Sequence, residues 1–251
     1  MRLQEHPHYL LLVWLIVSGL IVFGVTVSWG EGLVAMLVDG DRSRISLIIG
    51  LLYVIGTIHC ASRVVFLSGE LNQAAVIAEQ IAAERGRASV RASGGQLSVG
   101  DRILPRCVMT NYLVDLMNAH HETLDNETPT EKSNLTEALA ERLKGAHEMG
   151  WFVVDILLKL GLVGTIIGFI LMLGSVANTA SLDVNTMQKV LRQMSSGMGT
   201  ALFTTLAGLI GSILLGLQYL LLDKGSDELI HRVIRVAEID VKPSLKAAGN
   251  R

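Results

Sequence analysis

Four long apolar runs divide the chain, and polar segments separate them. The runs cover residues 10–28, 45–62, 152–176 and 200–222. Each is close to or above the roughly 18 apolar residues that a membrane-spanning helix needs, and none shows the regular polar positions of a helix with one face in water. The pattern predicts an all-α, polytopic membrane protein with four transmembrane helices. Buried helices of a soluble protein, and a signal peptide in the first run, are the less favoured alternatives.

The polar segments predict how the chain is divided between membrane and water. We expect an N-terminal transmembrane hairpin at 1–67, a cytoplasmic helical region at 68–150, pore-forming transmembrane helices at 151–222, and a cytoplasmic C-terminal helix and tail at 223–251. Glycine and serine recur through 86–105, which predicts a flexible, exposed linker there. Residues 29–44 and 177–199 are expected to be loops on the opposite side of the membrane.

Four further helices are expected in the polar segments. Residues 70–85 continue the second run, 106–124 have amphipathic spacing, and 131–149 lead without a break into the third run. A helix from Ser226 to about Asp240 begins with a cap of Ser226, Asp227 and Glu228 and stops before Pro243.

Charge predicts the orientation of the chain. Lysine and arginine concentrate in the long polar region and the tail, so both are expected in the cytoplasm. Both termini are then expected on the cytoplasmic side of a bacterial inner membrane. The net charge of −2 gives no general attraction to nucleic acid. Cys60 and Cys107 make no disulfide framework and are expected to be free thiols.

Small and hydroxyl-bearing residues follow helical stripes in the last two runs. In the third run Gly161, Gly164 and Gly168 share one face, and Thr165 borders it. In the fourth run the stripe is broader and contains Ser196, Gly197, Thr200, Ala201, Thr204, Thr205, Gly208 and Ser212. Small residues let membrane helices approach closely, whereas several hydroxyls on one face favour a polar lining. The stripes therefore predict close packing, a wet path, or both.

The apolar runs contain little charge. Asp155 and Lys159, four residues apart, are expected to pair or to extend toward water at the inner boundary. An ion pathway needs a titratable group in the bilayer, so we expect a conducting chain to receive its carboxylate from a partner helix. His120 and His121 are adjacent, so they point apart on a helix and do not predict a metal site. We expect no metal, no cofactor, no catalytic residue and no enzymatic activity.

Two motifs in these runs resemble the MotA/TolQ/ExbB proton channel family. The third run reads GLVGTIIG from Gly161 to Gly168, and the start of the fourth reads GMGTALFTTLAGL from Gly197. Their order and spacing are similar to the two membrane signatures of that family. Thr200 stands where TolQ and ExbB carry a glutamate, and four predicted spans match MotA.

The resemblance implies the pore-forming subunit of an ion-driven motor, a stator or energiser. In the family five copies surround a dimer of a single-span protein of the ExbD, TolR or MotB type, which carries a membrane aspartate, and ion flow drives rotation or force. It implies that Thr165 and Thr205 line the ion pathway, and we add Thr204 and Thr200. Helix packing is assigned to Gly161, Gly164, Gly168, Ala201 and Gly208.

Some alternatives stay open. Protons are the favoured ion because the signatures are closer to TolQ and ExbB, and sodium is the alternative. A structural membrane scaffold would use the small residues for packing alone. A substrate transporter is less favoured because the sequence shows no inverted repeat.

Overall fold

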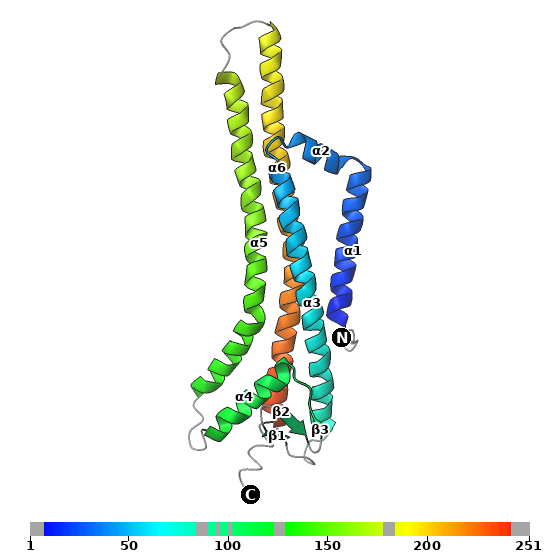
Figure 1. Cartoon of the computed structure of the whole chain (residues 1–251), viewed down its shortest axis with the longest axis vertical. Coiled ribbons are helices and arrows are strands. Elements are labelled where there is room, and N and C mark those ends of the chain that lie inside the picture. The colour runs from blue at the N-terminus through cyan, green and yellow to red at the C-terminus, as the bar shows by residue number, and fades with distance from the viewer. Residues whose placement is uncertain are drawn as a thin grey trace. The chain divides into compact units, whose positions relative to one another are not determined.

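Helices dominate the computed structural model, which describes residues 8–83, 90–93, 96–99, 102–122, 129–177 and 184–241 (Figure 1). The helices are α1 (Tyr9–Gly30), α2 (Leu33–Gly40), α3 (Ile45–Ala83), α4 (Val108–Glu122), α5 (Pro129–Ala177) and α6 (Val184–Val236), and a π-helical turn follows at Ala237–Val241. Four helices are long and apolar enough to cross a membrane, as the sequence predicts.

Two predicted continuities and one predicted separate helix are confirmed. Helix α3 continues past its apolar run to Ala83, and α5 runs from Pro129 through the third apolar run to Ala177. Helix α4 lies within the amphipathic segment predicted at 106–124. Each of α3 and α5 therefore carries an apolar part and a polar part on one unbroken axis.

Three predicted loops or breaks are wrong. Helix α2 lies within the predicted loop at 29–44, and α6 begins at Val184 and makes 184–199 helical. The tail helix is not separate, because α6 continues through Ser226 and no proline occurs between Val184 and Val236. Residues 178–183 and 242–251 lie outside the described part of the chain.

The chain forms two compact units. One contains 1–12, 63–147 and 221–251, and the other contains 13–62 and 148–220. The boundaries after residues 62, 147 and 220 lie within a few residues of the ends that the sequence analysis gives to its segments, at 67, 150 and 222. Helices α3, α5 and α6 contribute residues to both units.

The first unit holds a small antiparallel sheet that the sequence did not predict. Its order is β1 (Val90–Ser93), β2 (Gln96–Val99), β3 (Arg102–Ile103), with Val90 opposite Val99 and Ser98 opposite Ile103. The described residues of the segment predicted as an exposed linker are therefore ordered. Leu97 and Leu104 are buried, and their apolar side chains anchor a glycine-rich segment whose composition alone suggests a linker.

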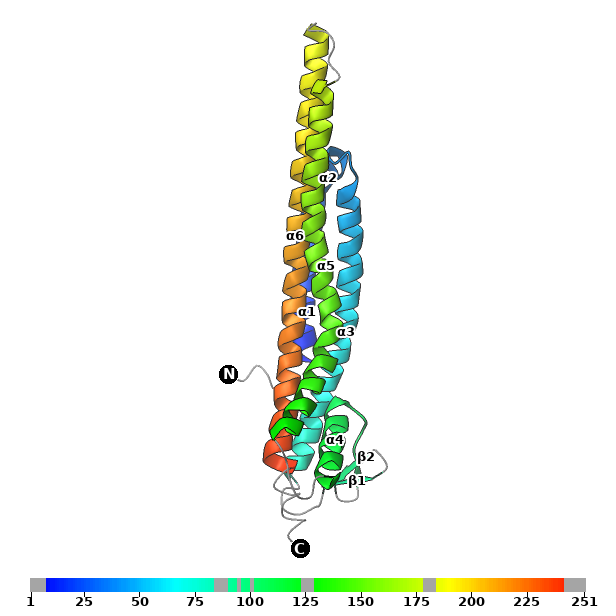
Figure 2. The same ribbon diagram turned by 90° about the vertical axis from the view of Figure 1, so that its left-hand side faces the viewer.

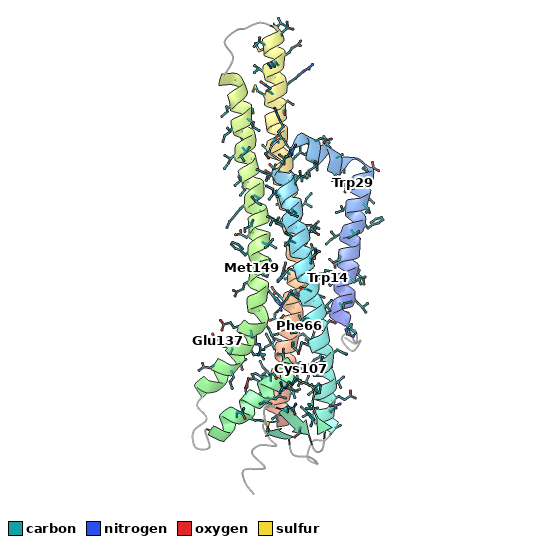
Figure 3. The ribbon with its side chains drawn as sticks, viewed as in Figure 1. Trp14, Trp29, Phe66, Cys107, Glu137 and Met149 are labelled. Atoms are coloured by element: carbon teal, nitrogen blue, oxygen red, sulfur yellow. The ribbon has the colours of Figure 1, made fainter. Side chains whose placement is uncertain are left out.

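Helix α4 is anchored in the same unit by its N-terminus and by one face. The Val108 N–H donates to Glu70 Oε2 on α3 at 2.8 Å, which satisfies a backbone donor at the helix start. Met109, Leu113 and Met117 lie four residues apart and are buried. Cys107, which directly precedes α4, is buried as well and is labelled in Figure 3.

Helices α3, α5 and α6 run alongside one another in the second unit (Figures 1 and 2). Helix α1, described throughout, has no buried residue, and Trp14 and Trp29 on it are labelled in Figure 3. Helix α2 ends against α6: a β-carbon on Gly40 would lie 2.5 Å from the Phe203 ring. The segment between α2 and α3 is thereby fixed to α6.

Candidate functional site

The small residues of α5 and α6 bring the two backbones into contact. A β-carbon on Gly168 would lie 2.6 Å from the Ala201 amide nitrogen, and one on Gly208 would lie 2.7 Å from the Leu157 carbonyl oxygen. Both distances are shorter than a carbon atom tolerates, and both involve backbone atoms that cannot rotate away. The residues predicted for helix packing therefore form the seam between these helices.

The seam has one antiparallel register. Gly168 meets Ala201, Gly164 meets Thr204, and Gly161 meets Gly208. Further along, Val154 lies beside Gly216, and Gly150 lies against the ring of Tyr219. Each step along α5 matches an opposite step along α6 to within one residue, so the register fixes which residues lie at the same level along the two helices.

Thr165 and Thr205 meet across this seam. Their hydroxyl oxygens lie 2.6 Å apart, and both residues are half-buried. Thr165 Oγ1 is also 3.2 Å from the Gly161 carbonyl, and Thr205 Oγ1 is 2.9 Å from the Ala201 carbonyl. Two oxygens at this separation need a proton between them, so one threonine donates to the other and the second donates to a carbonyl one turn back.

The hydrogen bond within the threonine pair therefore has two possible directions. Thr165 donates to Thr205 while Thr205 donates to the Ala201 carbonyl or to the Gly161 carbonyl at 3.3 Å, or Thr205 donates to Thr165 while Thr165 donates to Gly161. In either arrangement every hydroxyl proton has an acceptor, which an apolar environment requires. The pair can reverse its direction without moving a helix, and each hydroxyl oxygen keeps a lone pair that can accept another hydrogen bond.

Thr200 and Thr204, which we also assigned to the ion pathway, are enclosed. Both are fully buried, and Thr204 Oγ1 donates within α6, 2.8 Å from the Thr200 carbonyl. Thr200 Oγ1 lies 3.1 Å from the Gly40 carbonyl and accepts from the Arg42 N–H at 3.3 Å. Thr200 thus fixes the segment after α2, and neither side chain reaches the surface of the single chain.

Asp155 and Lys159 form the predicted ion pair, and the seam shows which residues of α6 lie at their level. Leu157 lies against Gly208 and Gly211, and Val154 lies beside Gly216. The pair is therefore level with the middle and inner half of the fourth apolar run. The inner ends of the third and fourth apolar runs, Phe152 and Leu222, were placed by hydropathy alone. The register between α5 and α6 does not bring these two ends to the same level.

A polar cluster between α3 and α6 was missed by the sequence interpretation. His59 Nδ1 lies 2.8 Å from Tyr219 Oη, and Gln218 Nε2 donates to Tyr53 Oη at 3.3 Å. Gln218 and Tyr219 are fully buried. They are the two large polar residues of the fourth apolar run, and this was the signal that could have located the cluster.

The first unit joins α5 to α6 through two polar pairs. His147 Nδ1 lies 2.9 Å from Asp223 Oδ1, and the His147 side chain is 4% exposed. Lys144 Nζ lies 2.7 Å from Asp227 Oδ1, and the hydrogen bond to that carboxylate raises the pKa of Lys144. Along α5 and α6, these pairs come in the same antiparallel order as the contacts of the seam.

The described residues contain no cluster of side chains that could hold a metal ion. Among them no three histidine, cysteine, aspartate or glutamate side chains gather as metal ligands would, and Cys60 and Cys107 are buried and form no disulfide. The chemistry available at the α5–α6 seam is accordingly that of hydroxyls and backbone carbonyls.

Comparison with known proteins agrees with the two motifs. The sequence model described as the MotA/TolQ/ExbB proton channel family matches residues 108–234, just over half of the chain, and this span contains both threonines of the pair. At a stringent threshold no curated protein and no solved structure matches the chain.

Proposed function

We propose, because the chain belongs to the MotA/TolQ/ExbB proton channel family, that it is the pore-forming subunit of an ion-driven motor in a bacterial inner membrane. In this proposal several copies, five as in related motors, surround a dimer of a single-span partner that carries a membrane aspartate. Ion flow past that aspartate is converted into rotation or force. The assignment is to a channel and energiser, not to an enzyme.

The Thr165–Thr205 pair is the observation that carries the proposal. Its hydroxyl oxygens are 2.6 Å apart on two half-buried residues, and the fourth apolar run has no carboxylate of its own. A protonated partner carboxylate can donate to either threonine, and an ionised one can accept from it. The threonine that donates to a carbonyl one turn back can release that carbonyl and donate to an ionised carboxylate instead, so the pair can bond to both protonation states of the partner without a change in the backbone.

The rigidity of α5 and α6 supports a motor more than a static pore. Backbone contacts at Gly168 and Gly208 make the two helices one solid wall. Both helices also extend beyond their apolar runs into the polar first unit. A force on the wall is therefore transmitted along unbroken helices to the polar side of the membrane.

Proton flux through the purified complex tests the proposal. The complex is extracted mildly from its own membrane, its stoichiometry is measured by native mass spectrometry, and it is reconstituted in liposomes with a trapped pH dye. Five copies with two of a single-span protein, and flux that Thr165→Val or Thr205→Val abolishes with assembly intact, are expected. Full flux in both variants would remove the pore assignment, and a monomer or dimer would remove the motor. Replacing the proton gradient by a sodium gradient distinguishes the sodium-driven alternative.

A structural scaffold is the second candidate, and the glycine seam is the observation that favours it. A scaffold uses Gly164 and Gly208 only for packing. It predicts that both threonine variants are tolerated, while Gly164→Leu and Gly208→Leu disrupt the assembly. The same set of variants therefore separates the two candidates.

A further inference from the structure

The ion pair of Asp155 and Lys159 lies on an otherwise apolar surface of α5. The two side chains remain 50% and 67% exposed, Asp155 and Lys159 respectively, although they contact each other. Phe152, Leu162 and Ile166 on the same helix are each more than half exposed. Charges are costly in a bilayer, and those that persist there face a polar path or another protein group.

The helix register makes the depth of this pair unusual. Asp155 lies between the levels of Gly211 and Gly216. These glycines precede Leu222, the end of the fourth apolar run, by 11 and 6 residues, so Asp155 is roughly 9 to 17 Å from that end along the helix. A lysine or aspartate at the boundary itself would reach water without difficulty. Asp155 is only three residues from the start of the third run at Phe152, so it is the fourth run that places the pair within the apolar span.

Asp155 lies below the threonine pair on a neighbouring side of α5. It precedes Thr165 by ten residues, which is about 15 Å along the axis and a rotation of roughly 80° about it. Gly164, which faces α6, is turned roughly 180° from Asp155 by the same geometry. Asp155 therefore points away from the α5–α6 seam, toward the outside of the chain where a pathway between subunits would pass.

Asp155 is also the one carboxylate in the four apolar runs. The runs at 10–28, 45–62 and 200–222 contain no aspartate or glutamate, and 152–176 contains Asp155 alone. His59 is the one histidine of these runs, and its Nδ1 is engaged with Tyr219 Oη between α3 and α6. Asp155 is thus the one exposed candidate in these runs for a proton acceptor on the inner side.

We propose that Asp155 is a proton acceptor in the inner half of the ion pathway, and this rests on the proposed function. The proton released beside Thr165 and Thr205 passes through water to an Asp155 carboxylate oxygen, which becomes neutral. Asp155 then returns the proton to water at the inner end and is ionised again, so one proton enters and one leaves. Lys159 is a positioning residue: its ammonium group neutralises the carboxylate between transfers and fixes its direction.

Reconstituted proton flux with paired variants tests this role. The variants are Asp155→Asn, Asp155→Glu, Lys159→Arg and the double variant Asp155→Asn/Lys159→Gln, each in the native complex with its partner. Glu141→Gln, an exposed acid on the polar part of α5, is the matched control. Asp155→Asn is expected to lower flux about tenfold or more, because proton transfer at that position is lost. Asp155→Glu, Lys159→Arg and the control keep most of the flux.

The double variant separates proton transfer from charge balance. It removes both charges, so it restores flux if the pair only neutralises itself, and that result would overturn the proposal. Persistently low flux in the double variant supports it. Unchanged flux in Asp155→Asn, or loss of the oligomer in that variant by native mass spectrometry, would also overturn it. Absence of flux in the unmodified complex would instead overturn the proposed function, so the two failures are distinguishable.

Discussion

Gly208 and Gly161 touch through their backbones: a β-carbon on Gly208 would lie 2.8 Å from the Gly161 Cα atom. The contact leaves no room for a methyl group unless one helix moves. Since the Thr165–Thr205 pair lies on the same seam, the spacing of the two helices also sets the distance between the hydroxyls. Packing and the candidate pathway are therefore one structural feature.

Alanine at the seam is expected to destabilise the helix pair. Gly208→Ala and Gly197→Ala each force a methyl group into backbone atoms, at 2.7 Å from the Leu157 oxygen and the Met172 nitrogen respectively. Overpacking of this kind costs about 1–3 kcal/mol. Thermal unfolding in detergent, followed by tryptophan fluorescence, measures the loss. Gly199→Ala is the control, because its methyl group would meet only Phe203 at 3.8 Å; equal stability of all three variants would contradict the seam.

Thr200→Val is expected to weaken the attachment of the segment after α2 and to spare ion flux. The change removes the hydroxyl that contacts the Gly40 carbonyl and the Arg42 N–H and leaves both backbone groups without it. We expect a loss of about 1–2 kcal/mol in unfolding stability. Thr200→Ser keeps the hydroxyl and should keep the stability. A large loss of flux in Thr200→Val at unchanged stability would return Thr200 to the ion pathway.

Asp41 makes the stability of the chain depend on acid pH. Burial by itself raises the pKa of Asp41, but hydrogen bonds from Ser43 and Ser46 outweigh it and hold the pKa below the ordinary carboxyl value. The stabilisation is therefore complete above about pH 4, the unfolded value, and is lost as pH falls through the lower folded value. Melting temperatures between pH 3 and pH 7 measure it. Asp41→Asn should be less stable at pH 7, and the difference should shrink toward pH 3; a constant difference would exclude the carboxylate as its source.

Neither cysteine is expected to react with a thiol reagent in the folded protein. Cys60 is fully buried and Cys107 is 3% exposed. Maleimide labelling in detergent, read by mass spectrometry, should give no modification until a denaturant is added. Both sites should then react together. Rapid labelling of Cys107 alone in the native state would show that the start of α4 opens independently.

Hydropathy and motifs were sufficient for the large-scale architecture. Apolar runs of this length have few structural solutions in a bilayer, because every backbone group must be paired internally. The helical spacing of Gly161, Gly164 and Gly168 was likewise enough to predict a close helix contact, because only small residues let two backbones approach. The likeness of the two motifs to one family pointed to the same residues from a separate direction.

Composition misled where a few long-range contacts outweigh local preference. The glycine and serine content of 86–105 predicts a linker, yet buried Leu97 and Leu104 accompany strands there. Thr200 and Thr205 both carry hydroxyls on one stripe of α6, and only the packing of α2 and α5 on that helix separates them. One is enclosed by a loop and the other pairs with Thr165.

The sequence by itself determined the number of spanning helices, the polar extensions of two of them and the small-residue faces, since these follow from local periodicity and length. The tertiary structure alone decided which threonine meets which, and which residues of α6 lie level with Asp155 and Lys159. Those properties depend on the register between α5 and α6, which arises from contacts between residues about 25 to 70 positions apart. A helix can be inferred from its own residues, but its sliding position against a neighbour is fixed only when both surfaces pack.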